Sequence, residues 1–156
     1  MVRMIQLLGV HHTSFTVSDM ARSLRFYRDL LGLKVTVDRL TDIQYLRDIV
    51  GYPDAKLHIV YLELPSGSDH ILELIQYIAP EGVKLDVATK NVGSGHLCLL
   101  VANIDEAYRY LKENGVEFIS PPVLITAGRN TGAYSCYMHD PDGITIELIQ
   151  PAARPA

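Results

Sequence analysis

The chain has 156 residues, of which 48% are hydrophobic and 21% are charged, and it carries a net charge of −4. This length and composition predict a single globular domain spanning 1–156, with a core of its own. The acidic balance argues against a sequence-independent nucleic-acid binder, which needs a basic surface. Neither a secretory signal nor a run of about 18 apolar residues is visible, so we expect a cytoplasmic protein without nucleic-acid or membrane partners.

The first half of the chain predicts a strand, a helix and three further strands. His12 opens a short apolar strand, and Asp19 then offers a side-chain oxygen to the start of a helix. Gly32 is expected to end this helix in the left-handed conformation. The apolar stripe of the helix consists of Met20, Leu24, Tyr27 and Leu31. Strands are expected at KVTVDRL, KLHIVYLEL and HILELIQY, which completes a first module at about 8–77.

An insertion at 41–55 interrupts the strands of the first module. Its Ile43, Leu46 and Val50 would share one face of a short helix, and GYPD follows as a turn. The insertion is either a cap over a cavity or an ordinary surface excursion. The following linker at 78–94 contains Pro and Gly and shows no clean periodicity.

The second half repeats the first in the same order. His96 aligns with His12, Asn103 with Asp19 and Gly115 with Gly32. The strands VEFIS, AYSCYMH and GITIELIQ complete a second module at about 95–150, before a tail at 151–156. The sequence therefore predicts an α+β fold of two tandem β-α-β-β-β modules, forming a curved, half-open mixed sheet around a cavity.

The two cysteines, Cys98 and Cys136, lie within predicted strands and show no CxxC spacing. In a cytoplasmic protein, this pattern indicates reduced thiols in the core rather than a disulfide.

The letters ELIQ end both modules and place Glu73 and Glu147 inside otherwise apolar strands. A single glutamate on an amphipathic strand usually faces solvent, and a single strand histidine is usually structural. Here each module begins with a histidine and ends with a glutamate, so a curled module would bring the two side chains together. Two imidazoles and two carboxylates are suitable ligands for a divalent cation.

Three motifs cover most of the chain: HHTSFTVSDMARSLRFYRDLLGL, GHLCLLVANIDEAYRYLKENGVEF and DPDGITIELIQ. Together they resemble the vicinal oxygen chelate superfamily, which includes glyoxalase I, methylmalonyl-CoA epimerase, extradiol dioxygenases and bleomycin-resistance proteins. The resemblance implies a homodimer, a small-molecule substrate with neighbouring oxygens, and one divalent metal ion (Zn, Ni, Co, Mn or Fe) per site. It places the metal ligands at His12, Glu73, His96 and Glu147. The 22 residues between Glu73 and His96 favour a site built from one chain.

The resemblance implies a metal-dependent lyase, isomerase or epimerase of the glyoxalase type. Such an enzyme transfers a proton next to a metal-bound substrate carbonyl through an enediolate or enolate. Glu147 is the first candidate for the base, and Glu73 is the second. The alternatives are an Fe(II) extradiol-type dioxygenase, which uses three ligands and none at the position of Glu73, and a non-catalytic binding protein for a small molecule such as an antibiotic.

Recognition of the substrate is expected to differ from that of glyoxalase I itself. At two positions where glyoxalase I carries Arg and Asn, this chain carries Thr16 and Tyr77. Candidate substrate contacts are Tyr61, Tyr137 and Arg129, the last in a loop where it could hold a substrate anion.

Overall fold

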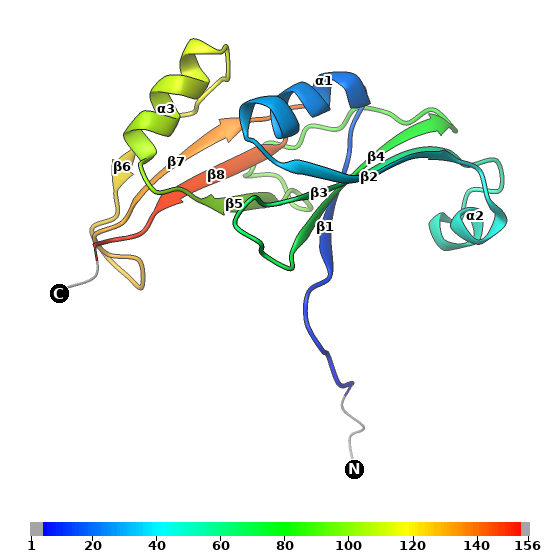
Figure 1. Cartoon of the computed structure of the whole chain (residues 1–156), viewed down its shortest axis with the longest axis horizontal. Coiled ribbons are helices and arrows are strands. Elements are labelled where there is room, and N and C mark those ends of the chain that lie inside the picture. The colour runs from blue at the N-terminus through cyan, green and yellow to red at the C-terminus, as the bar shows by residue number, and fades with distance from the viewer. Residues whose placement is uncertain (1–4, 154–156) are drawn as a thin grey trace. The chain divides into compact units, whose positions relative to one another are not determined.

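The computed structural model describes residues 5–153, in which two compact units are distinguished. Unit one comprises the residues up to Met20 together with Tyr27–Gly82, and unit two comprises Ala21–Phe26 together with the residues from Val83 onward. Each unit contains one four-stranded sheet (Figure 1). No helix within 5–153 is long and apolar enough to cross a membrane. Half of the predicted tail at 151–156, namely 154–156, lies outside the described residues.

The sheet of unit one has the strand order β1-β4-β3-β2. Its first strand pairs in parallel with its last, and the other two pairings are antiparallel. The strands are β1 (His12–Thr16), β2 (Lys34–Thr41), β3 (Lys56–Glu63) and β4 (Ile71–Ala79). Between β1 and β2 the chain forms helix α1 (Met20–Leu24), which continues as the π-helix η1 (Arg25–Leu30).

The sheet of unit two has the strand order β5-β8-β7-β6. Unit two thus repeats the order of unit one, in which the module's first strand is followed by its last, third and second strands. Again the first and last strands are parallel and their neighbours are antiparallel. The elements are β5 (His96–Leu100), α3 (Ile104–Glu113), β6 (Val123–Leu124), β7 (Tyr134–His139) and β8 (Thr145–Gln150). The predicted α+β fold of two repeated β-α-β-β-β modules with open mixed sheets is thus confirmed.

The first helix departs from a regular α-helix. Met20, Leu24 and Tyr27 are buried, as their spacing predicted. Phe26, which lies outside the predicted stripe, is also buried, whereas Leu31 is only half-buried. The cause is the π-helical segment, because its wider turn shifts the side chains relative to the 3.6-residue period.

The predicted cap at Asn103 and the predicted helix ends at Gly32 and Gly115 are found in the structure. Asn103 accepts a hydrogen bond from the backbone N–H of Glu106 at 3.1 Å and so caps the start of α3. Gly32 and Gly115 have φ angles of 75° and 82°, the left-handed conformation expected where each helix ends.

The predicted strand at 116–120 is wrong. Only Phe118 forms a bridge there, to Met138 on β7, and regular pairing begins later, at Val123. Two consecutive prolines, Pro121 and Pro122, separate the two places. Proline has no backbone N–H to donate, so a continuous strand cannot form through this segment.

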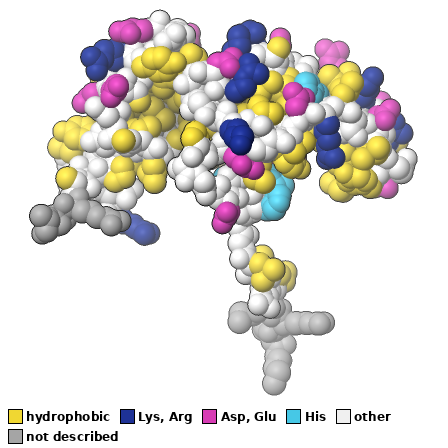
Figure 2. Space-filling view, viewed as in Figure 1, with side chains coloured by type: hydrophobic (Ala, Val, Ile, Leu, Met, Phe, Trp, Pro, Cys, Tyr) yellow, Lys and Arg dark blue, Asp and Glu magenta, His cyan; other side chains and the backbone are white. Residues whose placement is uncertain are grey.

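The insertion at 41–55 forms helix α2 (Gln44–Val50). Leu46 and Val50 pack against a buried cluster of Ala55, Leu57 and Ile59, as the predicted apolar face requires. Ile43 precedes the helix and stays 43% exposed, so it does not belong to that face. Figure 2 shows hydrophobic side chains gathered over α2, and the exposed hydrophobic residues of the insertion include Tyr45, Ile49 and Tyr52.

The glutamine of each ELIQ binds the first turn of its module's helix. The side-chain oxygen of Gln76 accepts a hydrogen bond from the backbone N–H of Met20 at 3.0 Å. Gln150 accepts one from the N–H of Ile104 at 2.8 Å. Because the first N–H groups of a helix have no partner within it, this bond joins the last strand of each module to its helix.

We expect Gln76→Ala and Gln150→Ala each to lower the free energy of unfolding by about 1 kcal/mol, since each leaves a part-buried helix N–H without its acceptor. Denaturant unfolding, followed by circular dichroism, measures the change. Gln44→Ala is the control, because Gln44 bonds only to Asp48 on the exposed face of α2. Equal stability of all three variants would contradict the role assigned to the two glutamines.

Candidate functional site

The first and last strands of unit one bring His12 and Glu73 together. In the parallel register Ser14 lies beside Glu73, and His12 shares the face of Ser14 two residues earlier. Nε2 of His12 lies 3.5 Å from Oε2 of Glu73. Glu73 is only 8% exposed, and a carboxylate so far removed from water needs a charged or donating partner. These two residues are called the unit-one pair.

Unit two contains the equivalent arrangement. Cys98 lies beside Glu147 in the parallel register, and Nε2 of His96 lies 3.2 Å from Oε2 of Glu147. We call His96 and Glu147 the unit-two pair. The prediction that a curled module would join its first histidine to its last glutamate therefore holds within each unit.

A tyrosine lies opposite each of these glutamates. Tyr61 on β3 is the register partner of Glu73, and Tyr137 on β7 is that of Glu147. Burial, and then the charge of the neighbouring carboxylate, raise the pKa of both phenols. Each hydroxyl thus keeps its proton at neutral pH and can donate a hydrogen bond. Tyr137 also contacts the ring of His96, with 5.2 Å between ring centroids.

The two glutamates differ in one further neighbour. The hydroxyl of Ser135 donates a hydrogen bond to Oε1 of Glu147 at 2.7 Å. The matching position in unit one is Ile59, because Ser135 lies opposite Ile149 and Ile59 lies opposite Ile75. Glu147 is therefore held through one oxygen while its other oxygen faces His96.

His11 contacts His12 and bears on its tautomer. The Nδ1 atoms of the two rings are 2.8 Å apart, so one ring donates to the other. When His12 is the donor, its Nε2 carries the lone pair and faces Glu73. A histidine ligand generally donates from its second nitrogen in this way, so His11 suits a supporting role for His12.

The cysteines are both free, and they differ in environment. Cys136 is buried, as predicted. The expectation that Cys98 belongs to the core is wrong, because Cys98 is exposed. It lies on the edge strand β5, on the face of His96 and Glu147. Although Cys98 as a residue is exposed, its sulfur is partly shielded from water. This desolvation and, second, the charge of Glu147 raise the pKa of Cys98 to about 11, so the thiol is neutral at physiological pH.

The remaining histidines and Arg129 lie outside these pairs. His58 pairs with Asp38 at 2.7 Å, and His70 bonds to the hydroxyl of Thr13 at 2.9 Å. Arg129 is exposed in the loop between β6 and β7, and its role in substrate binding stays a prediction.

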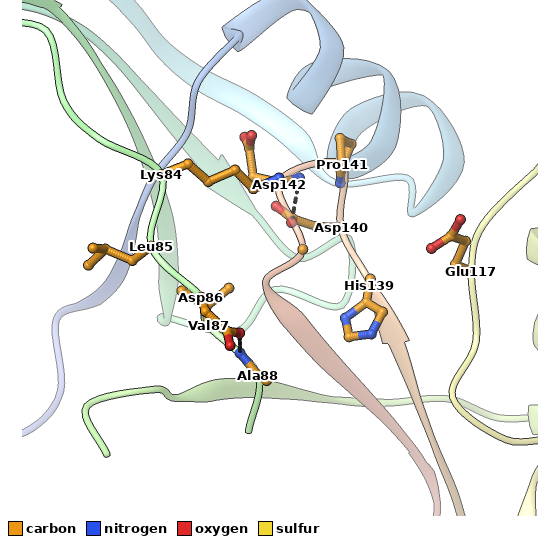
Figure 3. A pocket seen from close by; sticks show the side chains of 11 residues that line it. Lys84, Leu85, Asp86, Val87, Ala88, Glu117, His139, Asp140, Pro141 and Asp142 are labelled. Carbon is orange, nitrogen blue, oxygen red and sulfur yellow. Dashed lines mark hydrogen bonds between the residues drawn. The ribbon is translucent and has the colours of Figure 1, made fainter. Parts of the chain in front are cut away.

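A separate cavity of about 420 Å³ lies in unit two, between the segment 84–88 and the turn after β7 (Figure 3). His139 and Asp140 line it, and none of the predicted site residues does. Oδ1 of Asp140 accepts the backbone N–H groups of Asp142 and Ile144, at 2.9 and 2.8 Å. This carboxylate therefore stabilises the turn.

Neither pair alone supplies enough ligands for a divalent metal ion. Within residues 5–153, no group of three or more His, Cys, Asp or Glu side chains is placed to hold a metal ion. Protein metal sites for ions such as zinc generally use three or four ligands, so a single pair is too few. Two imidazoles and two carboxylates together form a donor set suited to first-row divalent ions.

Comparison with known sequences identifies the relatives. The family model of the Glyoxalase/Bleomycin resistance protein/Dioxygenase superfamily matches residues 9–148. A 2-epi-5-epi-valiolone epimerase from Actinomyces sp. is 30% identical over 153 residues, covering 95% of this chain and 82% of the relative. A lactoylglutathione lyase from Escherichia coli O157:H7 is 28% identical over 140 residues, covering 89% and 90%.

Solved structures share the fold. A glyoxalase family protein from Bacillus cereus superposes with a TM-score of 0.83 at 19% identity, covering 98% of this chain and 99% of that one. The antibiotic-binding protein TnmS3 from Streptomyces sp. CB03234 superposes with a TM-score of 0.62 at 22% identity, covering 96% and 100%. With the repeated sheets and the match over 9–148, the chain belongs to the Glyoxalase/Bleomycin resistance protein/Dioxygenase superfamily.

Proposed function

We propose that the protein is a metal-dependent enzyme of the glyoxalase type, which transfers a proton next to a substrate carbonyl. The observation that carries this proposal is the repeated pair of a histidine and a glutamate, 3.5 and 3.2 Å apart, each with a tyrosine opposite the glutamate. A protein that only binds a small molecule has no need of two such pairs. The epimerase and lyase relatives support the class of reaction.

The metal ion would be held by the unit-one pair and the unit-two pair together, in a homodimeric protein. A bound divalent ion supplies Lewis-acid stabilisation of the negative charge that develops on a substrate oxygen. Four protein ligands would leave room for two neighbouring substrate oxygens on an octahedral ion. The alternative, a dioxygenase-type site with three ligands, would leave Glu73 without a function.

Glu147 is the proposed base. Its Oε1 accepts a hydrogen bond from the hydroxyl of Ser135, which limits the rotation of the carboxylate and keeps Oε2 directed toward His96. A base held in one orientation loses little entropy when it takes a proton from the substrate. Tyr137 retains its own proton and can donate a hydrogen bond to a substrate oxygen.

Epimerisation is favoured over glutathione-dependent lyase chemistry. An epimerase removes a proton from one face of a carbon and returns one to the other face, and Glu73 with Tyr61 supplies a second set equivalent to Glu147 with Tyr137. Tyr77, at the position where glyoxalase I carries Asn, packs its ring against Tyr52 with 5.9 Å between centroids. The substrate proposed is accordingly a hydroxy ketone or similar carbonyl compound.

We expect the purified protein to bind about one divalent ion per chain, because the proposed site uses four ligands for one ion. The His96→Ala variant should lose most of the bound metal. Cobalt titration with elemental analysis measures the content. His58→Ala is the matched control, because the ring of His58 pairs with Asp38 away from either pair. Retention of full metal content by His96→Ala in a folded protein would contradict the site.

Ser135→Ala should weaken metal binding by about 10–100-fold, the usual effect of removing a group that orients a ligand. Competition with a chromophoric chelator gives the dissociation constant. Ser66→Ala, an exposed loop change, serves as the control. An unchanged dissociation constant in Ser135→Ala would show that the hydroxyl does not position Glu147.

Glu147→Gln should lower the rate of proton transfer by about 10²–10⁴-fold, since it removes the base and retains the shape of the side chain. The substrate comes from a screen of hydroxy ketones, hemithioacetals and acyl-CoA epimers. In heavy water, the wild-type protein is expected to introduce deuterium at the carbon next to the carbonyl, and the variant is not. Consumption of dioxygen with opening of a catechol ring would replace this mechanism with that of a dioxygenase.

A further inference from the structure

Arg39 on β2 lies on the face of the sheet that carries the unit-one pair. The antiparallel register places it opposite Ile59 on β3. Tyr61, two residues further along β3, lies opposite Glu73 on β4. Because side chains alternate along a strand, Arg39, Ile59 and Tyr61 point to the same side as Glu73.

The side chain of Arg39 has an unused donor. Its Nε atom is buried and has no hydrogen-bond partner among residues 5–153. Arg28 and Arg47, by comparison, are paired with Asp29 at 2.6 Å and with Asp42 at 3.8 Å. A buried N–H without an acceptor is costly to maintain. The planar set of N–H groups of a guanidinium matches the oxygens of a carboxylate or phosphate.

Tyr61 is the polar neighbour of Arg39 on this face. Arg39 lies opposite Ile59, and Tyr61 is the next residue of β3 that points to the same side. Helix α2 is seated on this face by the packing of its Leu46 on the cluster that contains Ile59. The insertion therefore supplies a wall on the same face as Glu73.

We propose that Arg39 and Tyr61 form a subsite for an anionic group of the substrate. The substrate is then a carbonyl compound with two neighbouring oxygens at its reacting end and a carboxylate or phosphate a few bonds away. This inference rests on the proposed function, because the reacting end must lie at the unit-one pair. The insertion at 41–55 would then form one wall of this subsite through helix α2.

Three related probes test the subsite: dihydroxyacetone, dihydroxyacetone phosphate and 5-hydroxy-4-oxopentanoate. All three are hydroxy ketones, and the last two add a phosphate or a carboxylate. Calorimetric titration of cobalt-loaded wild-type protein should show at least one anionic probe binding about 10–100-fold more tightly than dihydroxyacetone, the range of charged hydrogen bonds. Arg39→Gln should abolish that difference, and Arg39→Lys should restore part of it.

Arg109→Gln, on the exposed side of α3, is the control and should bind all three probes as the wild type does. The subsite is overturned if both anionic probes bind no more tightly than dihydroxyacetone, or if Arg39→Gln keeps the preference. Metal content is measured on the same samples. If the wild-type protein binds no metal, the proposed function is refuted. In that case the subsite is still supported if dihydroxyacetone phosphate binds and its binding depends on Arg39. The subsite is overturned if that Arg39-dependent binding is absent.

Discussion

The parallel pairing of the first and last strands of each module is the constraint on which the rest of the site depends. Strands that are far apart in the sequence become immediate neighbours, β1 beside β4 and β5 beside β8. This register sets His12 against Glu73 and His96 against Glu147. A shift of one residue in either pairing would turn the glutamate to the opposite face and separate it from its histidine. Burial of Leu74 and Leu148 on that opposite face holds both registers in place.

Each ELIQ motif serves the backbone and the chemistry together. Its glutamate faces the histidine of the first strand, and its glutamine receives the first N–H of the helix. The site side chains are thereby fixed to the element that follows the first strand. The duplication then diverges around this shared frame. Unit two adds Ser135 beside Glu147, whereas unit one carries Arg39 and helix α2 on the face of the sheet that bears Glu73.

The sequence predicted the duplication and the two pairs because both are visible as spacing along the chain. His12 and His96 open the modules, and the two ELIQ motifs close them, without reference to any neighbour in space. The roles of Gln76 and Ser135 could not be predicted in this way, since each depends on which residues lie across the sheet. The same limit applies to Cys98, whose exposure follows from the edge position of β5. The interruption after 116–120 was predictable from Pro121 and Pro122. Neither proline has a backbone N–H to donate, so regular strand pairing cannot run through them.

The central claim is that the two pairs jointly hold one metal ion. Anomalous diffraction from crystals of the cobalt- or zinc-loaded protein tests it most directly. The account predicts one anomalous peak per chain, with Nε2 of both site histidines and an oxygen of both glutamates at about 2.0–2.2 Å, whether the pairs come from one chain or from two. The account would be contradicted by a peak at each pair separately, or by a metal ion bound elsewhere with both pairs free.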